Sequence, residues 1–145
     1  MVVREVGILF RGFTLVNAKY HETSGKEIDR DLRSGLLTAI INFAESAFAS
    51  SLIDYLQGTK YVIAFTEDKI KAVDSIDPEL LIGYAILDKS KKKIEKHIHK
   101  VIQPLLSQCI SYFKAEYEGK NLSEVSQFRS FKSCLDKTFL RQAKT

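Results

Sequence analysis

Few residues of this sequence stand at the spacings that catalytic or cofactor chemistry requires. Its seven glycines occupy positions 7, 12, 25, 35, 58, 83 and 119. A dinucleotide-binding fingerprint or a phosphate-binding loop needs glycines close together, where the backbone must approach a phosphate. Neither pattern is present, so we expect no nucleotide site of these types.

The histidines and cysteines do not form a metal-binding pattern. His97 and His99 are two residues apart on an expected helix and point roughly 200° apart, so they cannot hold one metal as an i, i+4 pair does. His21 has no neighbouring ligand, and Cys109 and Cys134 are far from C-x-x-C spacing. We expect no metal and no cofactor, and two reduced, buried thiols rather than a disulfide. A Cys-His nucleophile assembled by the fold remains an open alternative.

Acidic residues gather in the polar stretch 66–79, where a carboxylate pair for acid-base catalysis could be sought. They are Glu67, Asp68, Asp74, Asp77 and Glu79. Lys69 and Lys71 mix the sign of the charge, and no apolar wall is evident that would shift a pKa. We interpret them as solvated loop charges, which leaves no catalytic candidate and predicts a protein that is not an enzyme.

The one concentration of charge lies at the start of a long expected helix. It comprises Lys89, Lys91, Lys92, Lys93, Lys96 and Lys100, with His97 and His99. Cations at a helix amino terminus oppose its dipole, so helix stability does not account for them. One interpretation is that these residues form a solvated helix face. The other is that some of them contact an anionic lipid surface or an acidic protein, and the residues expected to do so are Lys91, Lys92, Lys93, Lys96 and Lys100. Nucleic acid is not expected, because the aromatic residues fall mostly on buried stripes.

Length and composition indicate one folded domain spanning residues 1–145. Apolar residues make up 45% of the chain and charged residues 28%, and the net charge is +4. The amino terminus has no cationic leader, and the uncharged runs are shorter than the roughly 20 residues of a membrane-spanning helix. We expect a cytoplasmic protein that touches a membrane peripherally at most.

The first half of the chain reads as a hairpin followed by a helix. Apolar residues alternate on both sides of Arg11-Gly12 over residues 5–20, which predicts two strands joined by a tight turn. Apolar residues then recur at helical spacing from Asp29 to Ala49. Three strands are expected next, at 52–56, 61–65 and 80–87. The last two are continuously apolar, which indicates a sheet covered by helices on both faces.

The second half reads as two helices. The first spans about 90–118, with a kink expected at Pro104. Its buried stripe is expected to be Ile94, Ile98, Val101, Leu105, Cys109 and Tyr112. Gly119 should end it, and Asn121 to Glu124 offers a capping-box start for the last helix. Gly35 and Gly83 are expected to permit close helix-to-sheet packing.

The predicted order is β-β-α-β-β-β-α-α, an α/β (α+β) three-layer sandwich around a five-stranded antiparallel sheet. This order, the opening hairpin and the segment DLRSGLLTAIINFA at 31–44 resemble the longin domain, and the segment is similar to stand-alone archaeal proteins of the longin and roadblock type. A roadblock domain would open with a helix, so the longin resemblance is preferred. No SNARE heptad segment follows within these residues, so a membrane-fusion role does not carry over.

The resemblance implies an interaction module that assembles with a like domain, as a homodimer, or with a small GTPase in trafficking-type assemblies. In the longin order, strand 52–56 lies at a sheet edge beside the first helix. An edge strand with one charge and no proline is unguarded against strand addition. The predicted interface is Ala47, Ser50, Leu52, Ile53, Asp54, Tyr55 and Leu56. The alternatives are a small-ligand sensory domain of PAS type and a roadblock-type GTPase-regulating subunit.

Overall fold

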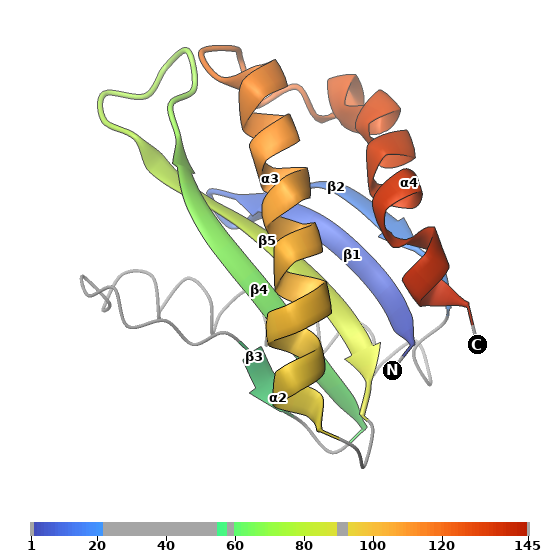
Figure 1. Ribbon diagram of the computed structural model, residues 1–145. Helices are drawn as coiled ribbons and strands as arrows, with labels where there is room; N and C mark the ends of the chain where they lie inside the picture. The colour runs from blue at the N-terminus through green and yellow to red at the C-terminus, as the bar shows by residue number, and fades with distance from the viewer. Residues whose placement is uncertain (1, 22–54, 58–59, 90–92, 145) are drawn as a thin grey trace.

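The structure is a computed structural model that describes residues 2–21, 55–57, 60–89 and 93–144 (Figure 1). These residues form an antiparallel sheet with helices packed on it. The strands are β1 (Val3–Phe10), β2 (Phe13–Lys19), β3 (Tyr55–Gln57), β4 (Tyr61–Ile70) and β5 (Glu79–Asp88). The helical segments are α2 (Ile94–His97), the π-helix η1 (Ile98–Ile102), α3 (Gln103–Tyr117), the 3-10 helix η2 (Val125–Phe131) and α4 (Lys132–Ala143). The expected α+β class with an antiparallel sheet is confirmed.

The sheet has the order β2-β1-β5-β4-β3, with four long strands and a three-residue β3 at one edge. Every neighbouring pair is antiparallel. The expected hairpin is present, and its two-residue turn has positive φ at both Arg11 (52°) and Gly12 (81°). Positive φ at both positions is the signature of a type I′ turn, whose twist matches that of the strands.

The fourth strand is longer than expected, and the prediction of a polar connection from Thr66 was wrong. β4 continues to Ile70 and pairs with β5 as far as Ile70 opposite Glu79. Glu67 and Lys69 are exposed, whereas Ile70 is fully buried and Asp68 lies against α3 through Lys114. One face of this part of the strand is exposed to solvent, so exposed residues alternate along the strand with residues that face the protein.

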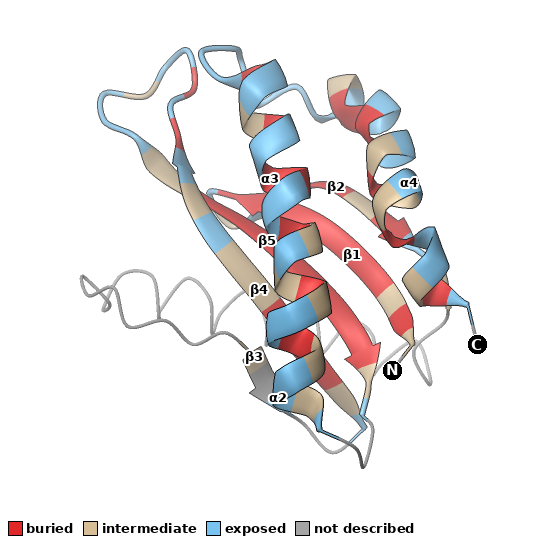
Figure 2. Ribbon diagram, in the orientation of Figure 1, coloured by how far each residue is buried: buried red, intermediate tan, exposed pale blue. Residues whose placement is uncertain are grey.

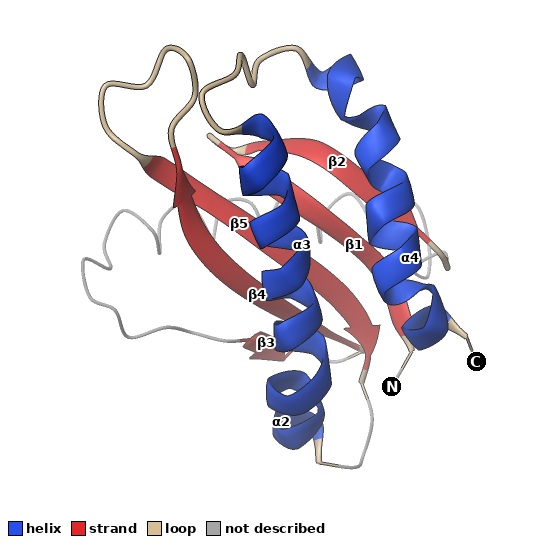
Figure 3. Ribbon diagram, turned by 45° about the horizontal axis from the view of Figure 1, so that its top comes forward, coloured by secondary structure: helices blue, strands red, loops and turns tan. Residues whose placement is uncertain are grey.

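The central strand β5 buries side chains on both faces. Leu81, Ala85 and Leu87 belong to one buried cluster, and Ile82, Tyr84 and Ile86 belong to another. Helices α3 and α4 both lie over the same face of the sheet (Figures 2 and 3). The helix expected over residues 29–49 lies outside the described residues.

The long helix buries a different stripe from the one predicted. Val101 and Leu105 are only partly buried, and Tyr112 is 51% exposed. The buried residues after Ile98 are Ile102, Leu106, Cys109, Ile110, Phe113 and Tyr117. The reason is η1, where the N–H of Gln103 donates to the carbonyl of Ile98 five residues back. Pro104 has no N–H for Lys100, and the wide turn before it moves the later residues round the helix.

The end of the first long helix and the beginning of the last are close to expectation. Gly119 has φ 81° just after α3. Glu124 is itself the N-cap of η2, and its carboxylate accepts from the N–H of Ser126 instead of closing the capping box expected from Asn121 to Glu124. The 3-10 helix η2 then leads into α4. Gly83 permits the expected close packing, because a Cβ there would lie 3.0 Å from Cγ1 of Ile110 on α3.

The sequence predicts a buried core that comprises Leu36, Ile40, Phe43, Ile63, Phe65, Ile82, Ile86, Val101, Leu105, Phe128 and Leu135. Of these residues, Ile63, Ile82, Ile86, Phe128 and Leu135 are buried. Phe65 is only partly buried, and Leu36, Ile40 and Phe43 lie outside the described residues.

The register of α3 can be tested with two adjacent aromatic residues. Phe113 is fully buried, whereas Tyr112 faces out and its hydroxyl accepts from Gln108. We expect Phe113→Ala to lower the free energy of unfolding by about 3–5 kcal/mol and Tyr112→Ala to lower it by less than about 1 kcal/mol. Urea titration followed by circular dichroism measures both, and equal losses would contradict the shifted stripe.

Candidate functional site

The described part of the lysine cluster lies at one end of the sheet and gains a member from another segment. Lys93 is the N-cap residue before α2, Lys96 lies on α2 and Lys100 lies on η1, and all three are exposed. Lys91 and Lys92 lie outside the described residues. Lys89 follows β5, and its N–H donates to the carbonyl of Lys60, which precedes β4, at 3.0 Å. The sequence analysis missed Lys60, because only strand pairing brings it to this end. We call Lys60, Lys89, Lys93, Lys96 and Lys100 the basal lysine surface.

The predicted partner interface is described only at its carboxyl end. Tyr55 and Leu56 belong to β3, the terminal strand of the sheet, and Tyr55 is partly buried. The remaining interface residues, Ala47, Ser50, Leu52, Ile53 and Asp54, lie outside the described residues. β3 pairs with β4 alone among the described strands, so its outer edge faces none of them.

At the opposite end of the sheet, Arg11 gathers two of the carboxylates that the sequence analysis assigned to a loop. Its guanidinium donates to both oxygens of Asp74 at 3.1 Å and to both oxygens of Glu79 at 2.8 and 2.5 Å. The hydroxyl of Ser75 also donates to Glu79. We call Arg11, Asp74, Ser75 and Glu79 the apical ion-pair cluster.

The apical ion-pair cluster is built for structure rather than proton transfer. Hydrogen bonds from Arg11 hold the pKa values of Asp74 and Glu79 below their usual range, and the same bonds raise the pKa of Arg11. A general acid needs a raised carboxyl pKa, so these groups are poor acids near neutral pH. The cluster joins the β1–β2 turn to the β4–β5 loop.

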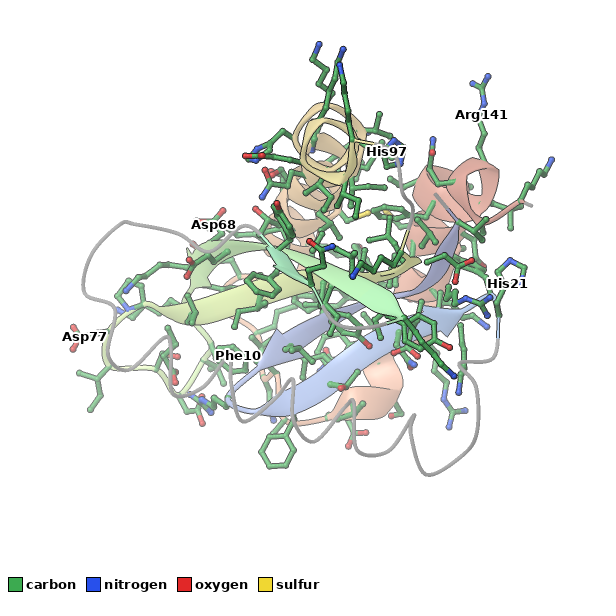
Figure 4. The ribbon with its side chains drawn as sticks, turned by 90° about the horizontal axis from the view of Figure 1, so that it is seen from below. Phe10, His21, Asp68, Asp77, His97 and Arg141 are labelled. Atoms are coloured by element: carbon green, nitrogen blue, oxygen red, sulfur yellow. The ribbon has the colours of Figure 1, made fainter. Side chains whose placement is uncertain are left out.

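The histidines His97 and His99 have different surroundings. His99 is exposed, 3.9 Å from Glu95, whereas Nε2 of His97 is buried with no hydrogen-bond partner. Burial lowers the pKa of His97. His21 lies near the carbonyl of Ala143, at 2.5 Å, and it stands apart from Asp68 and Asp77 in Figure 4. Within the described ranges, no three His, Cys, Asp or Glu side chains could share a metal ion.

The two cysteines are free thiols on facing helices. Cys109 is buried on α3, and Cys134 is partly buried on α4. Burial raises the pKa of Cys109 to about 11 and also raises the pKa of Cys134. A thiol with a raised pKa is a weak nucleophile at neutral pH, because little thiolate is present.

The sequence analysis missed a buried carboxylate on the face of the sheet opposite α3 and α4. Glu5 is fully buried and accepts a hydrogen bond from the hydroxyl of Tyr84. The ring of Tyr84 lies over Gly7, where a Cβ would come within 2.5 Å of its Cε1. Gly7 was the feature of the sequence that could have indicated this packing, because its lack of a side chain makes room for the ring of Tyr84.

Comparison with known proteins assigns no family. No protein-family model and no curated protein matches the sequence. Among the described helices, none has the length and apolar character needed to cross a membrane. Function is therefore inferred from the described surfaces.

The apical ion-pair cluster predicts a pH dependence of stability. Because Asp74 and Glu79 have lowered pKa values in the folded protein, their contribution is present above the unfolded carboxyl pKa near 4 and is lost as pH falls through the folded values. We expect Arg11→Gln to lower Tm slightly at neutral pH and progressively less towards about pH 3. Thermal melts across this range measure the difference.

Arg141→Gln is the matched control, because Arg141 is exposed on α4 and forms no ion pair with a described residue. A difference between Arg11→Gln and wild type that stayed constant with pH would contradict the role assigned to the cluster.

Proposed function

We propose that this chain is a non-catalytic protein-interaction module of longin type that pairs with a like domain through its β3 edge. A small GTPase is the alternative partner, and the module then works in cytoplasmic assemblies of the trafficking type. The observation that carries the proposal is the position of β3, a short terminal strand whose outer edge faces no other described strand. Strand addition at such an edge supplies main-chain hydrogen bonds to a partner.

The finer three-layer arrangement is part of this proposal. Leu9, Ile63, Ile82 and Ile86 are buried on the face of the sheet that carries neither α3 nor α4. Apolar strand residues need a cover, and the amphipathic stretch 29–49 has the length and periodicity to supply one. The order β-β-α-β-β-β-α-α then follows, with the cover beside the β3 edge.

The chemistry of the described residues favours an interaction module over an enzyme. Asp74 and Glu79 accept hydrogen bonds from Arg11, and Glu5 accepts one from Tyr84. The thiols have raised pKa values, and the imidazoles of His21 and His97 do not converge. These groups act within the fold rather than in a shared reaction site.

A sensory domain of PAS type is less well supported. Such a domain needs a cavity, and the space between α3 and η2 is occupied by aromatic rings. Phe113, Tyr117, Phe128 and Phe131 pack with ring centroids between 4.7 and 6.2 Å apart. Contacts at these distances are those of a filled core.

The test is the mass of the protein in solution as a function of concentration. Backbone N–H groups alternate in direction along a strand, so Leu56→Pro and Gln57→Pro remove donors on opposite sides of β3. We expect light scattering to show a wild-type dimer at high concentration. One proline variant should be destabilised, and the other should remain folded and monomeric.

Two outcomes would contradict pairing with a like domain through β3. A wild-type protein that stays monomeric at every concentration would remove self-association. A dimer that persists in the folded proline variant would place the interface elsewhere. Native mass spectrometry of the same samples would reveal a copurifying small molecule if the sensory alternative holds.

A further inference from the structure

We propose that the basal lysine surface is a docking surface for an anionic lipid bilayer. This inference goes beyond the protein-partner function and does not depend on it. Three separate segments bring exposed lysines to the same end of the sheet. These segments are the approach to β4, the exit from β5 and the α2–η1 helix (Figure 1).

The strand register fixes this arrangement. Tyr61 at the start of β4 pairs with Asp88 at the end of β5, which places Lys60 and Lys89 side by side. The chain enters α2 shortly after Lys89. Lys93, Lys96 and Lys100 follow at intervals of three and four residues, which keeps them on neighbouring positions of one helical face.

The described residues at this end carry more positive than negative charge. Among the described residues of the α2–η1 helix, Glu95 is the one acidic side chain, and Asp88 is held by Arg4. Lys89, Lys93, Lys96 and Lys100 together with Glu95 leave three positive charges on this part of the described surface.

The described fold makes little use of four of these lysines, Lys89, Lys93, Lys96 and Lys100. Its described arginine ion pairs, Arg4 with Asp88 and Arg11 with Asp74 and Glu79, tie elements together. By contrast, Lys89, Lys93, Lys96 and Lys100 are exposed and form no ion pair with a described residue. Those at the start of the helix also oppose its dipole. A contact outside the molecule accounts for their concentration better than folding does.

The residue types favour a bilayer over a nucleic acid or an acidic protein. All five cations are lysines, which are flexible point charges, whereas directional recognition of carboxylates and phosphates favours the planar fork of arginine. Single-stranded nucleic acid requires exposed aromatic platforms. Tyr61, at this end of the sheet, is partly buried, and the guanidinium of Arg4 lies 5.8 Å from its ring centroid. A diffuse layer of anionic headgroups suits the surface best.

Vesicle cosedimentation of the full chain tests the proposal. The vesicles are phosphatidylcholine alone or phosphatidylcholine mixed with phosphatidylserine, at low and high salt. We expect wild type to bind the mixed vesicles at low salt, to bind far less at high salt and not to bind phosphatidylcholine alone. The basal variant, with Lys89, Lys93, Lys96 and Lys100 changed to Gln, should bind about 100-fold or more weakly.

The control variant changes Lys71, Lys120, Lys132 and Lys137 to Gln. It removes four charges from the β4–β5 loop, the α3–η2 loop and α4, away from the basal lysine surface, and all four residues are exposed. We expect it to retain most of the binding. Thermal melts establish that both variants fold, and the basal variant should melt no lower than wild type, because the changed lysines at the helix start oppose its dipole.

Three results would overturn the proposal. The first is a wild type that fails to bind mixed vesicles at low salt. The second is an equal loss of binding in the two variants, which would indicate a general charge effect. Tighter binding to a single-stranded oligonucleotide than to mixed vesicles at the same salt would assign the surface to nucleic acid instead. Dimerisation through β3 is measured separately, so either proposal can fail without the other.

Discussion

The central strand β5 is buried on both faces, and the other elements are arranged around that burial. Its alternate residues face two different apolar clusters, one of them beneath α3 and α4. Close packing on each face depends on a glycine, since Gly83 admits Ile110 of α3 and Gly7 admits the ring of Tyr84. Burying apolar area on both sides of one strand stabilises the domain. The described arginine ion pairs lie at the two ends of the sheet.

The two ends use charge in different ways. At the apical end, Arg11 forms bidentate contacts with Asp74 and Glu79 and holds a turn against a loop. At the basal end, Arg4 forms an ion pair with Asp88. The exposed residues Lys89, Lys93, Lys96 and Lys100 add positive charge there, and none of them pairs with a described carboxylate. Planar guanidinium groups suit fixed internal contacts, and flexible ammonium groups suit a surface that meets a diffuse partner. This division underlies the proposal of a membrane-facing end.

The proposed partner edge and the proposed lipid surface are neighbours. β3 ends at Gln57, and Lys60 follows before β4 begins. A chain added to the β3 edge would therefore lie next to the basal lysine surface. The two surfaces nevertheless rest on different forces, since strand addition uses main-chain hydrogen bonds and lipid contact uses screened electrostatic attraction. Their different responses to salt would separate them.

Local sequence patterns were sufficient to predict the α+β class, the opening hairpin with its Arg11-Gly12 turn, the end of α3 at Gly119 and the exposure of the lysines on the long helix. Each depends on residues close together in the chain, through side-chain alternation, backbone φ or helical periodicity. The tertiary structure decided the length of β4, because pairing with β5 gives the stretch 66–70 a partner that its composition does not reveal. It decided which residues of α3 are buried, because the π-turn before Pro104 changes the helical phase. It also placed Lys60 beside the lysines that follow β5, and Arg11 beside Asp74 and Glu79. In both cases the residues are more than 25 positions apart in the chain, so they come together only when the strands pair.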